Sequence, residues 1–157
     1  MLLAELLKGI EYTVVTGDIG IDIKGIAYDS RQVEPGYLFV CISGFKTDGH
    51  LYIDQAIKNG ACAVLIEKTI DHIDAVTVIM TVNNRRALAL LASNFYDRPS
   101  HNMKVIGITG TNGKTTTTHL IKAILEEAGL KTGLMGTLYA QVDNKTIDFG
   151  HTTPEAP

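Results

Sequence analysis

The chain has 157 residues, of which 45% are hydrophobic and 20% are charged, and this balance excludes an intrinsically disordered chain. Its net charge of −3 gives no electrostatic reason to expect a nucleic-acid partner. No apolar run has the length that would span a bilayer, and Glu5 and Lys8 interrupt residues 1–12 as in a short amphipathic helix rather than a signal peptide. We therefore expect a cytoplasmic protein without a membrane partner, built as one domain or two small ones.

Residues 25–67 alternate strand-like and helix-like segments. Strands are expected at 23–30 and 37–42, joined by a tight reversal that Pro35 and Gly36 favour. Residues 50–60 place apolar side chains at helical spacing, and the Asn-Gly pair at 59–60 is typical of a helix C-terminus. A further strand follows at 61–67.

The pattern continues with a strand at 75–82 and a helix from about residue 85 that ends before Pro99. Asn83 and Asn84 are candidate N-terminal caps of this helix. Residues 1–98 thus form an N-terminal α/β domain, and residues 99–103 form a linker. Cys41 and Cys62 lie in apolar runs without metal-ligand spacing, which indicates two buried, reduced thiols.

A second α/β pattern starts at Lys104. It predicts a strand, a helix, another strand at 132–137 and a hairpin around 142–145. One helix cannot cover both faces of a parallel sheet, so we expect residues 104–157 to be the truncated beginning of a larger domain. The missing part would be the C-terminal part of the same protein.

The segment GITGTNGKTTTTHL, residues 107–120, has the features of a phosphate-binding loop. Its glycines permit unusual backbone angles, and its backbone amides stand at the positive end of the helix that follows. Lys114 adds a positive charge, and Thr115 adds a hydroxyl group for Mg²⁺. The spacing is a variant, because Ile108 stands where the general pattern has its first glycine.

This loop resembles the ATP loop of the Mur ligases, the ATP-dependent amino-acid ligases of peptidoglycan synthesis. Residues 29–50, DSRQVEPGYLFVCISGFKTDGH, resemble the first domain of the same family, which holds the uridine nucleotide of the substrate. MGTLYA at 135–140 and TTPEA at 152–156 favour the branch that adds the third peptide residue. The resemblance implies a small UDP-binding α/β domain followed by the start of a P-loop domain with a parallel sheet.

Site residues follow from the resemblance position by position. The ATP-binding residues would be Gly110, Thr111, Asn112, Gly113, Lys114, Thr115 and Thr116, with Lys114 catalytic and Thr115 a Mg²⁺ ligand. The substrate-binding residues would be Tyr28, Ser30, Phe45, Lys46, Thr47, His151, Thr152 and Thr153. His151 replaces the asparagine of many relatives, and an exposed loop histidine is the alternative interpretation. Asp29 and Arg31 could form a surface ion pair, and spacing alone makes Lys46 an ordinary solvated lysine.

The implied reaction joins a diamino acid to UDP-N-acetylmuramoyl-L-alanyl-D-glutamate through an acyl phosphate, with ATP and Mg²⁺ as cofactors. The chain of 157 residues alone would be inactive, because other residues that hold magnesium and select the amino acid lie downstream in relatives. The sequence leaves meso-diaminopimelate and L-lysine open as the added residue. Two alternatives are the related ligase that adds D-Ala-D-Ala and, for a chain that ends at residue 157, a non-catalytic nucleotide-binding module.

Overall fold

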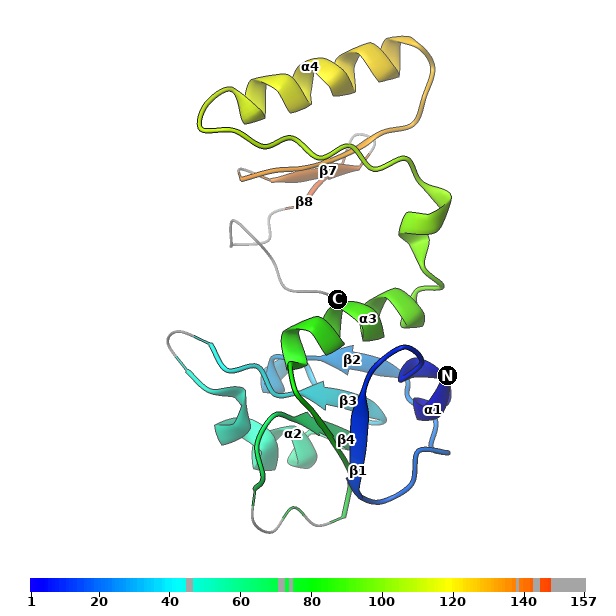
Figure 1. Ribbon diagram of the computed structural model, residues 1–157, viewed down its shortest axis with the longest axis vertical. Helices are drawn as coiled ribbons and strands as arrows, with labels where there is room; N and C mark the ends of the chain where they lie inside the picture. Colours follow the sequence, from blue (N-terminus) through cyan, green and yellow to red (C-terminus); the bar gives the residue numbers. More distant parts are fainter. Residues whose placement is uncertain (45–46, 71–72, 74, 138, 143–144, 148–157) are drawn as a thin grey trace. The chain divides into compact units, whose positions relative to one another are not determined.

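The computed structural model describes residues 1–44, 47–70, 73, 75–137, 139–142 and 145–147. The chain divides into two compact units, one formed by Met1–Met103 and the other beginning at Lys104 (Figure 1). The α/β class expected from the sequence is confirmed. Within the described residues, no helix is both long and apolar enough to cross a membrane.

The first unit is built on a five-stranded sheet with the strand order β1-β5-β4-β3-β2. Four of its strands run parallel: β2 (Gly25–Ala27), β3 (Tyr37–Val40), β4 (Ala61–Ile66) and β5 (Thr77–Thr81). These four confirm the strands predicted from the apolar runs, although β2 is shorter than expected. The strand β1 (Tyr12–Thr16) pairs antiparallel with β5 at the edge, and we did not predict it.

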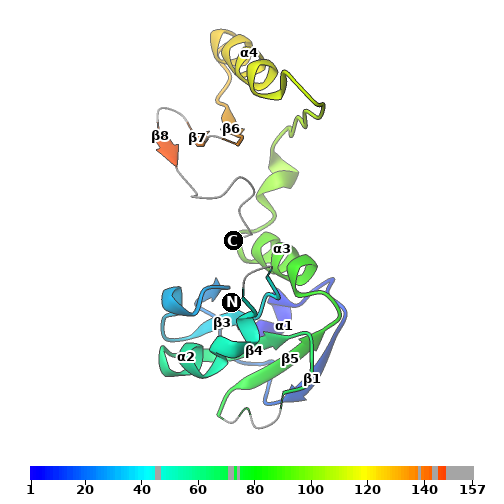
Figure 2. The same ribbon diagram turned by 90° about the vertical axis from the view of Figure 1, so that its left-hand side faces the viewer.

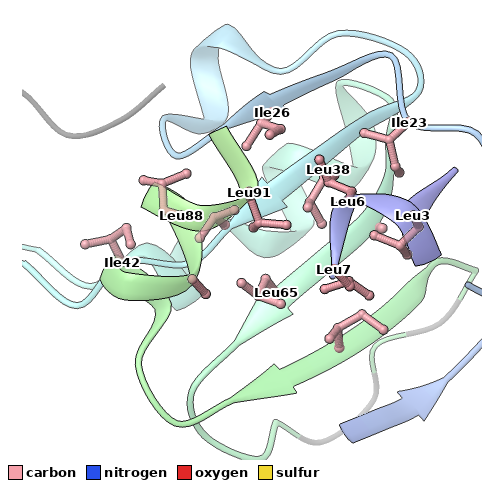
Figure 3. Packing of buried hydrophobic residues seen from close by; sticks show 14 residues of the cluster. Leu3, Leu6, Leu7, Ile23, Ile26, Leu38, Ile42, Leu65, Leu88 and Leu91 are labelled. Carbon is pink, nitrogen blue, oxygen red and sulfur yellow. The ribbon is translucent and has the colours of Figure 1, made fainter. Parts of the chain in front are cut away.

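Helices cover both faces of this sheet (Figures 1 and 2). On one face, α1 (Leu3–Leu6) and α3 (Asn84–Phe95) pack with the strands around a cluster that includes Leu6, Leu38, Leu65, Leu88 and Leu91 (Figure 3). On the other face, α2 (Ile53–Lys58) packs over a second cluster, whose members include Phe39, Ile53, Ala56, Val64 and Ile66.

The central strands β3 and β4 are apolar without interruption because each face of the sheet has its own core. Along β3, Leu38 and Val40 belong to the cluster under α3, whereas Phe39 belongs to the cluster under α2. Successive side chains of a strand point to opposite faces, so a strand covered on both faces needs apolar residues at every position. Fully burying one such side chain stabilises the fold by about 1.5–3 kcal/mol.

Turns and caps confirm several expectations. The reversal at residues 33–36 is present, with Gly36 at a φ of 88° and a hydrogen bond from the Tyr37 amide to the Glu34 carbonyl. Asn83 is the N-cap of α3 and accepts a hydrogen bond from the Arg86 amide at 2.9 Å. Asn84 is not a second cap. It is fully buried, and its side chain donates a hydrogen bond to the Cys41 carbonyl at the end of β3.

Two further expectations are refined. Cys41 is buried and Cys62 is only partly buried, and both are free thiols. The predicted linker contains a short 3-10 helix, η3 (Pro99–Asn102), which begins after Arg98 in a left-handed backbone conformation with a φ of 51°.

The second unit contains the helix α4 (Lys114–Glu127) and a three-stranded antiparallel sheet of β6 (Gly133–Met135), β7 (Ala140–Val142) and β8 (Lys145–Ile147). The helix, the strand near residue 134 and the pairing of Val142 with Lys145 in a hairpin were all predicted. The strand predicted from Lys104 is wrong, because residues 104–110 have no strand structure. A strand exists only through hydrogen bonds to a neighbour, and no described segment pairs with these residues.

Candidate functional site

The predicted phosphate loop leads directly into α4. Gly113 is the N-cap residue of this helix and has a φ of 78°, which a residue with a side chain rarely adopts. In the part of the chain that the structure describes, no side-chain hydrogen bond caps this end of α4. The amides of the first helical turn have no acceptor within the helix, so they are available to an anion together with the positive end of the helix dipole.

Lys114 adds its charge beside these amides. Its Nζ atom donates a hydrogen bond to the Gly110 carbonyl oxygen at 2.6 Å, so the side chain folds back over the loop. Gly110, Gly113 and Lys114 are all exposed. The loop therefore presents a lysine and a helix N-terminus to solvent at the same place, an arrangement that suits a phosphate group.

The Thr115 carbonyl is held by two side chains one turn further along α4. The Thr118 hydroxyl donates to it at 2.8 Å, and His119 Nδ1 lies 2.7 Å from the same oxygen. Since a carbonyl can only accept, this nitrogen of His119 carries the proton. In the neutral ring the other nitrogen, Nε2, accepts from the Tyr139 hydroxyl at 2.9 Å, which connects α4 to the residue before β7.

We did not predict His119 and Tyr139 as part of the site. The spacing of four residues between Thr115 and His119 places both on one face of a helix and could have indicated the first contact. Nothing in the sequence pairs His119 with Tyr139.

The candidate substrate residues of the first unit lie after β2, where Tyr28 and Ser30 are, and after β3, where Thr47 is. Asp29 caps the short 3-10 helix η1 (Ser30–Gln32) by accepting from the Arg31 amide at 3.0 Å, and the Arg31 guanidinium binds the same carboxylate. The hydrogen bond from the Arg31 side chain lowers the pKa of Asp29. The surface ion pair expected from the sequence is thus present.

Ser30 is buried, and its carbonyl oxygen accepts from Asn59 Nδ2 at 2.8 Å at the end of α2. Tyr28 is half-buried and packs against the cluster under α3. Thr47 is exposed, and its hydroxyl lies 3.1 Å from the Tyr52 hydroxyl. Phe45, Lys46, His151, Thr152 and Thr153 lie outside the described residues.

A network of polar side chains anchors the loop that carries Thr47. Asp48 Oδ1 lies 2.5 Å from His50 Nδ1, and Asp48 Oδ2 accepts from Lys68 Nζ at 2.5 Å. The hydrogen bond from Lys68, followed by those from the backbone and ring of His50, holds the pKa of the Asp48 carboxyl well below its usual range. We did not predict this network. The two-residue spacing of Asp48 and His50 could have indicated their contact, but nothing in the sequence links Lys68 to them.

No group of three or more His, Cys, Asp or Glu side chains among the described residues could hold a metal ion by itself. A metal ion that accompanies a nucleotide needs fewer protein ligands, because Mg²⁺ takes substrate phosphates together with one or two protein oxygens. Thr115 is exposed at the start of α4 and offers a hard oxygen beside the phosphate loop. The residues present therefore fit a nucleotide-bound Mg²⁺.

Two family models match the chain. Residues 22–96 match the model described as Mur ligase family, catalytic domain, and residues 108–157 match the Mur ligase middle domain. A ligase of Syntrophomonas wolfei, named UDP-N-acetylmuramoyl-L-alanyl-D-glutamate--2,6-diaminopimelate ligase, is 58% identical over 156 residues. The match covers 99% of this chain and 32% of that protein, so the chain spans about a third of the length of the curated relatives it matches.

Solved structures agree on the fold. The MurF ligase of Thermotoga maritima in complex with ADP has a TM-score of 0.51 and 32% identity, covering 65% of this chain and 23% of that one. A UDP-N-acetylmuramoyl-L-alanyl-D-glutamate--2,6-diaminopimelate ligase has a TM-score of 0.67 at 24% identity, covering 94% of this chain and 30% of that one. At that identity, the second likeness supports the fold alone.

Proposed function

The chain belongs to the Mur ligase family, and from that premise we propose that the whole protein is an ATP-dependent ligase of peptidoglycan precursor synthesis. It adds a diamino acid to UDP-N-acetylmuramoyl-L-alanyl-D-glutamate. The observation that carries this proposal is the 58% identity, over 99% of the chain, to a relative named for that reaction. The same name favours 2,6-diaminopimelate over L-lysine as the added residue.

We assign the two nucleotides to different units. Residues 1–98 form the UDP-substrate domain, residues 99–103 the linker, and residues 104–157 the beginning of the ATP-binding domain. In the first unit, Tyr28, Ser30 and Thr47 are the described candidates for substrate contacts, and Phe45 and Lys46 extend the proposal. His151, Thr152 and Thr153, in the second part of the chain, complete the proposed set of substrate contacts. In the second unit, residues 110–116 bind ATP. The ADP complex of the structurally similar MurF ligase supports a nucleotide role for this family.

Two bond exchanges complete the proposed reaction. The free carboxylate of the D-glutamate attacks the γ-phosphorus of ATP, the bond between the β-phosphate oxygen and the γ-phosphorus breaks, and ADP leaves. An amino group of the diamino acid then attacks the acyl phosphate, loses a proton and forms the amide, and phosphate leaves. The activation is needed because a carboxylate has no adequate leaving group.

The residues of this chain contribute position and charge. The amides at the start of α4 and the Lys114 ammonium stabilise the negative charge that develops on the transferred phosphoryl group. Thr115 would hold a nucleotide-bound Mg²⁺, which would neutralise part of the phosphate charge. The remaining rate acceleration comes mainly from holding the two reactants in line. Phosphoryl transfer requires little covalent chemistry from the protein itself.

The alternative is the ligase that adds D-Ala-D-Ala, which the likeness to a MurF ligase at 32% identity favours. A choice of acceptor by the full-length protein separates the two. With ATP present, we expect product from UDP-N-acetylmuramoyl-L-alanyl-D-glutamate and diaminopimelate. Product formed instead from the UDP-muramoyl-tripeptide and D-Ala-D-Ala would replace the proposal by the alternative.

A further inference from the structure

The loop after β3 is closed by hydrogen bonds at both of its limbs. Ser43 and Asp48 form an antiparallel bridge, and the Gly44 amide donates to the Thr47 carbonyl at 2.9 Å. The next residue, Gly49, donates its amide to the Ile42 carbonyl at 2.9 Å. These bonds join residues 42–44 on one limb to residues 47–49 on the other.

The Asp48 carboxylate connects this loop to His50 and Lys68. Oδ1 accepts from the His50 amide at 3.0 Å and contacts His50 Nδ1, and Oδ2 accepts from Lys68 Nζ. Both oxygens are thus occupied by donors of the protein, so the carboxylate serves to hold the loop and has little capacity left for a ligand.

His50 connects this carboxylate to the sheet, and its protonation state follows from its partners. The Glu67 amide donates to His50 Nε2 at 3.1 Å. A backbone N–H can only donate, so Nε2 carries no proton, and the neutral ring has its proton on Nδ1, where it is donated to Asp48. The ring is buried, with a side-chain exposure of 3%.

The anchor continues into the core of the first unit. Glu67 Oε1 accepts from the Asn84 amide at 2.6 Å. The Asn84 side chain donates to the carbonyl oxygens of Cys41 at 2.7 Å and Leu65 at 3.0 Å. His50 therefore joins the loop to the carboxyl ends of β3 and β4, the edge at which open α/β sheets bind ligands.

We propose that His50 is a positioning residue for UDP-substrate binding: its Nδ1–H tautomer, held between Asp48 and the Glu67 amide, fixes the loop limb that carries Thr47 in the conformation that binds the uridine nucleotide. This inference rests on the proposed function. A loop that is ordered before binding saves the entropy that the substrate would otherwise have to supply, so the effect appears in affinity rather than in turnover. His50 does not touch the reacting atoms in this account.

The test compares variants of the full-length protein by steady-state kinetics. His50→Leu removes both ring contacts, and we expect the KM for the UDP-muramoyl-dipeptide to rise about tenfold or more, the cost of losing buried hydrogen bonds. The kcat and the KM for ATP should stay within about twofold, because the phosphate loop is in the other unit. His50→Asn keeps an amide donor near the Nδ1 position and should recover part of the loss.

Two further measurements keep the inference testable if His50→Leu does not fold. Lys68→Met removes only the exposed partner of Asp48, and it should raise the same KM about two- to threefold without lowering kcat. In the wild-type protein labelled with ¹⁵N-histidine, one buried ring should show a protonated Nδ1 and a bare Nε2, and that signal should vanish in His50→Asn.

Three results would overturn the inference while leaving the proposed function intact. The first is an unchanged KM for the UDP-muramoyl-dipeptide in His50→Leu. The second is a fall in kcat together with an equal rise in the KM for the dipeptide and in the KM for ATP. The third is a ring that is protonated on Nε2. A wild-type protein that ligates neither muramoyl peptide would instead remove the proposed function, and the inference with it.

Discussion

The Nδ2 atom of Asn84 lies 2.7 Å from the carbonyl oxygen of Cys41, although 43 positions separate the two residues. The same amide donates to the Leu65 carbonyl, and Asn84 Oδ1 accepts from the Thr81 hydroxyl at 2.6 Å. One fully buried side chain thus joins the ends of β3, β4 and β5 at the first residue of α3.

Asn84→Ala should destabilise the protein by about 2–4 kcal/mol, because it removes the acceptor of the buried Thr81 hydroxyl and a donor to each of the Cys41 and Leu65 carbonyls. Asn83→Ala is the matched control, since it removes only the exposed N-cap and should cost about 1 kcal/mol. Urea unfolding of both variants measures the difference. Equal losses in the two variants would contradict the structural role of Asn84.

Asp48 predicts a specific pH dependence of stability. Its pKa is lowered in the folded protein, so its contribution is fully present above the unfolded pKa of about 3.9 and is lost as the pH falls through the folded pKa. Asp48→Asn should therefore be less stable than the wild type at pH 7 by about 1 kcal/mol, a value discounted for partial exposure.

The two stabilities should converge as the pH falls below about 4, where the unfolded carboxyl takes up a proton. Thermal melts between pH 7 and the lowest pH at which the protein remains folded test this convergence. In a Lys68→Met background, the stability difference between the protein with Asp48 and its Asp48→Asn variant should change less with pH, because the hydrogen bond from Lys68 is the main cause of the lowered pKa of Asp48. A constant gap between wild type and Asp48→Asn would exclude the ion pair as its origin.

Gly113 predicts a loss of nucleotide affinity upon a small substitution. A Cβ atom would meet nothing within 4 Å, but the φ of 78° costs a residue with a side chain about 1–2 kcal/mol. Gly113→Ala should relieve this strain by moving the amides at the start of α4, and we expect the KM for ATP to rise about fivefold or more. Gly107→Ala is the control, since a Cβ atom there would also meet nothing within 4 Å and the residue has no positive φ. The KM of this variant for ATP should be unchanged.

Tyr139→Phe separates ring packing from hydrogen bonding in the second unit. The edge-to-face contact with His119, at 6.0 Å between centroids, is retained, whereas the hydroxyl bond to Nε2 is lost. We expect a loss of stability of about 0.5–1 kcal/mol and an altered His119 signal in ¹⁵N-histidine spectra. An unaltered signal would mean that the hydroxyl does not bind this ring.

Most of the first unit could be predicted because the strands β3 and β4 are apolar at every position and the turns contain glycine, proline or asparagine. The edge strand β1 was missed because its five residues are mostly exposed, so that no apolar alternation indicated a buried face. The strand expected from Lys104 was wrong for a different reason. Its residues favour a strand, but strand structure depends on a neighbour that local sequence does not specify.

The candidate sites show the same division. The phosphate loop was predictable because glycine, lysine and threonine follow one another along the chain and act together. The anchor formed by Asp48, His50 and Lys68 was not, because Lys68 lies 20 positions from its partner and only the parallel pairing of β3 and β4 brings them together. Contacts made by chain topology leave no local pattern in the sequence.

The central claim is tested most directly by comparing the full-length protein with its Lys114→Met variant. Both are assayed for conversion of UDP-N-acetylmuramoyl-L-alanyl-D-glutamate to the tripeptide. Mass spectrometry of the product measures the rate. We expect ATP-dependent product from the wild type and a rate reduced about 100-fold or more in the variant, because the variant lacks the charge that stabilises the transferred phosphoryl group. Equal rates, or no product from the wild type, would contradict the account.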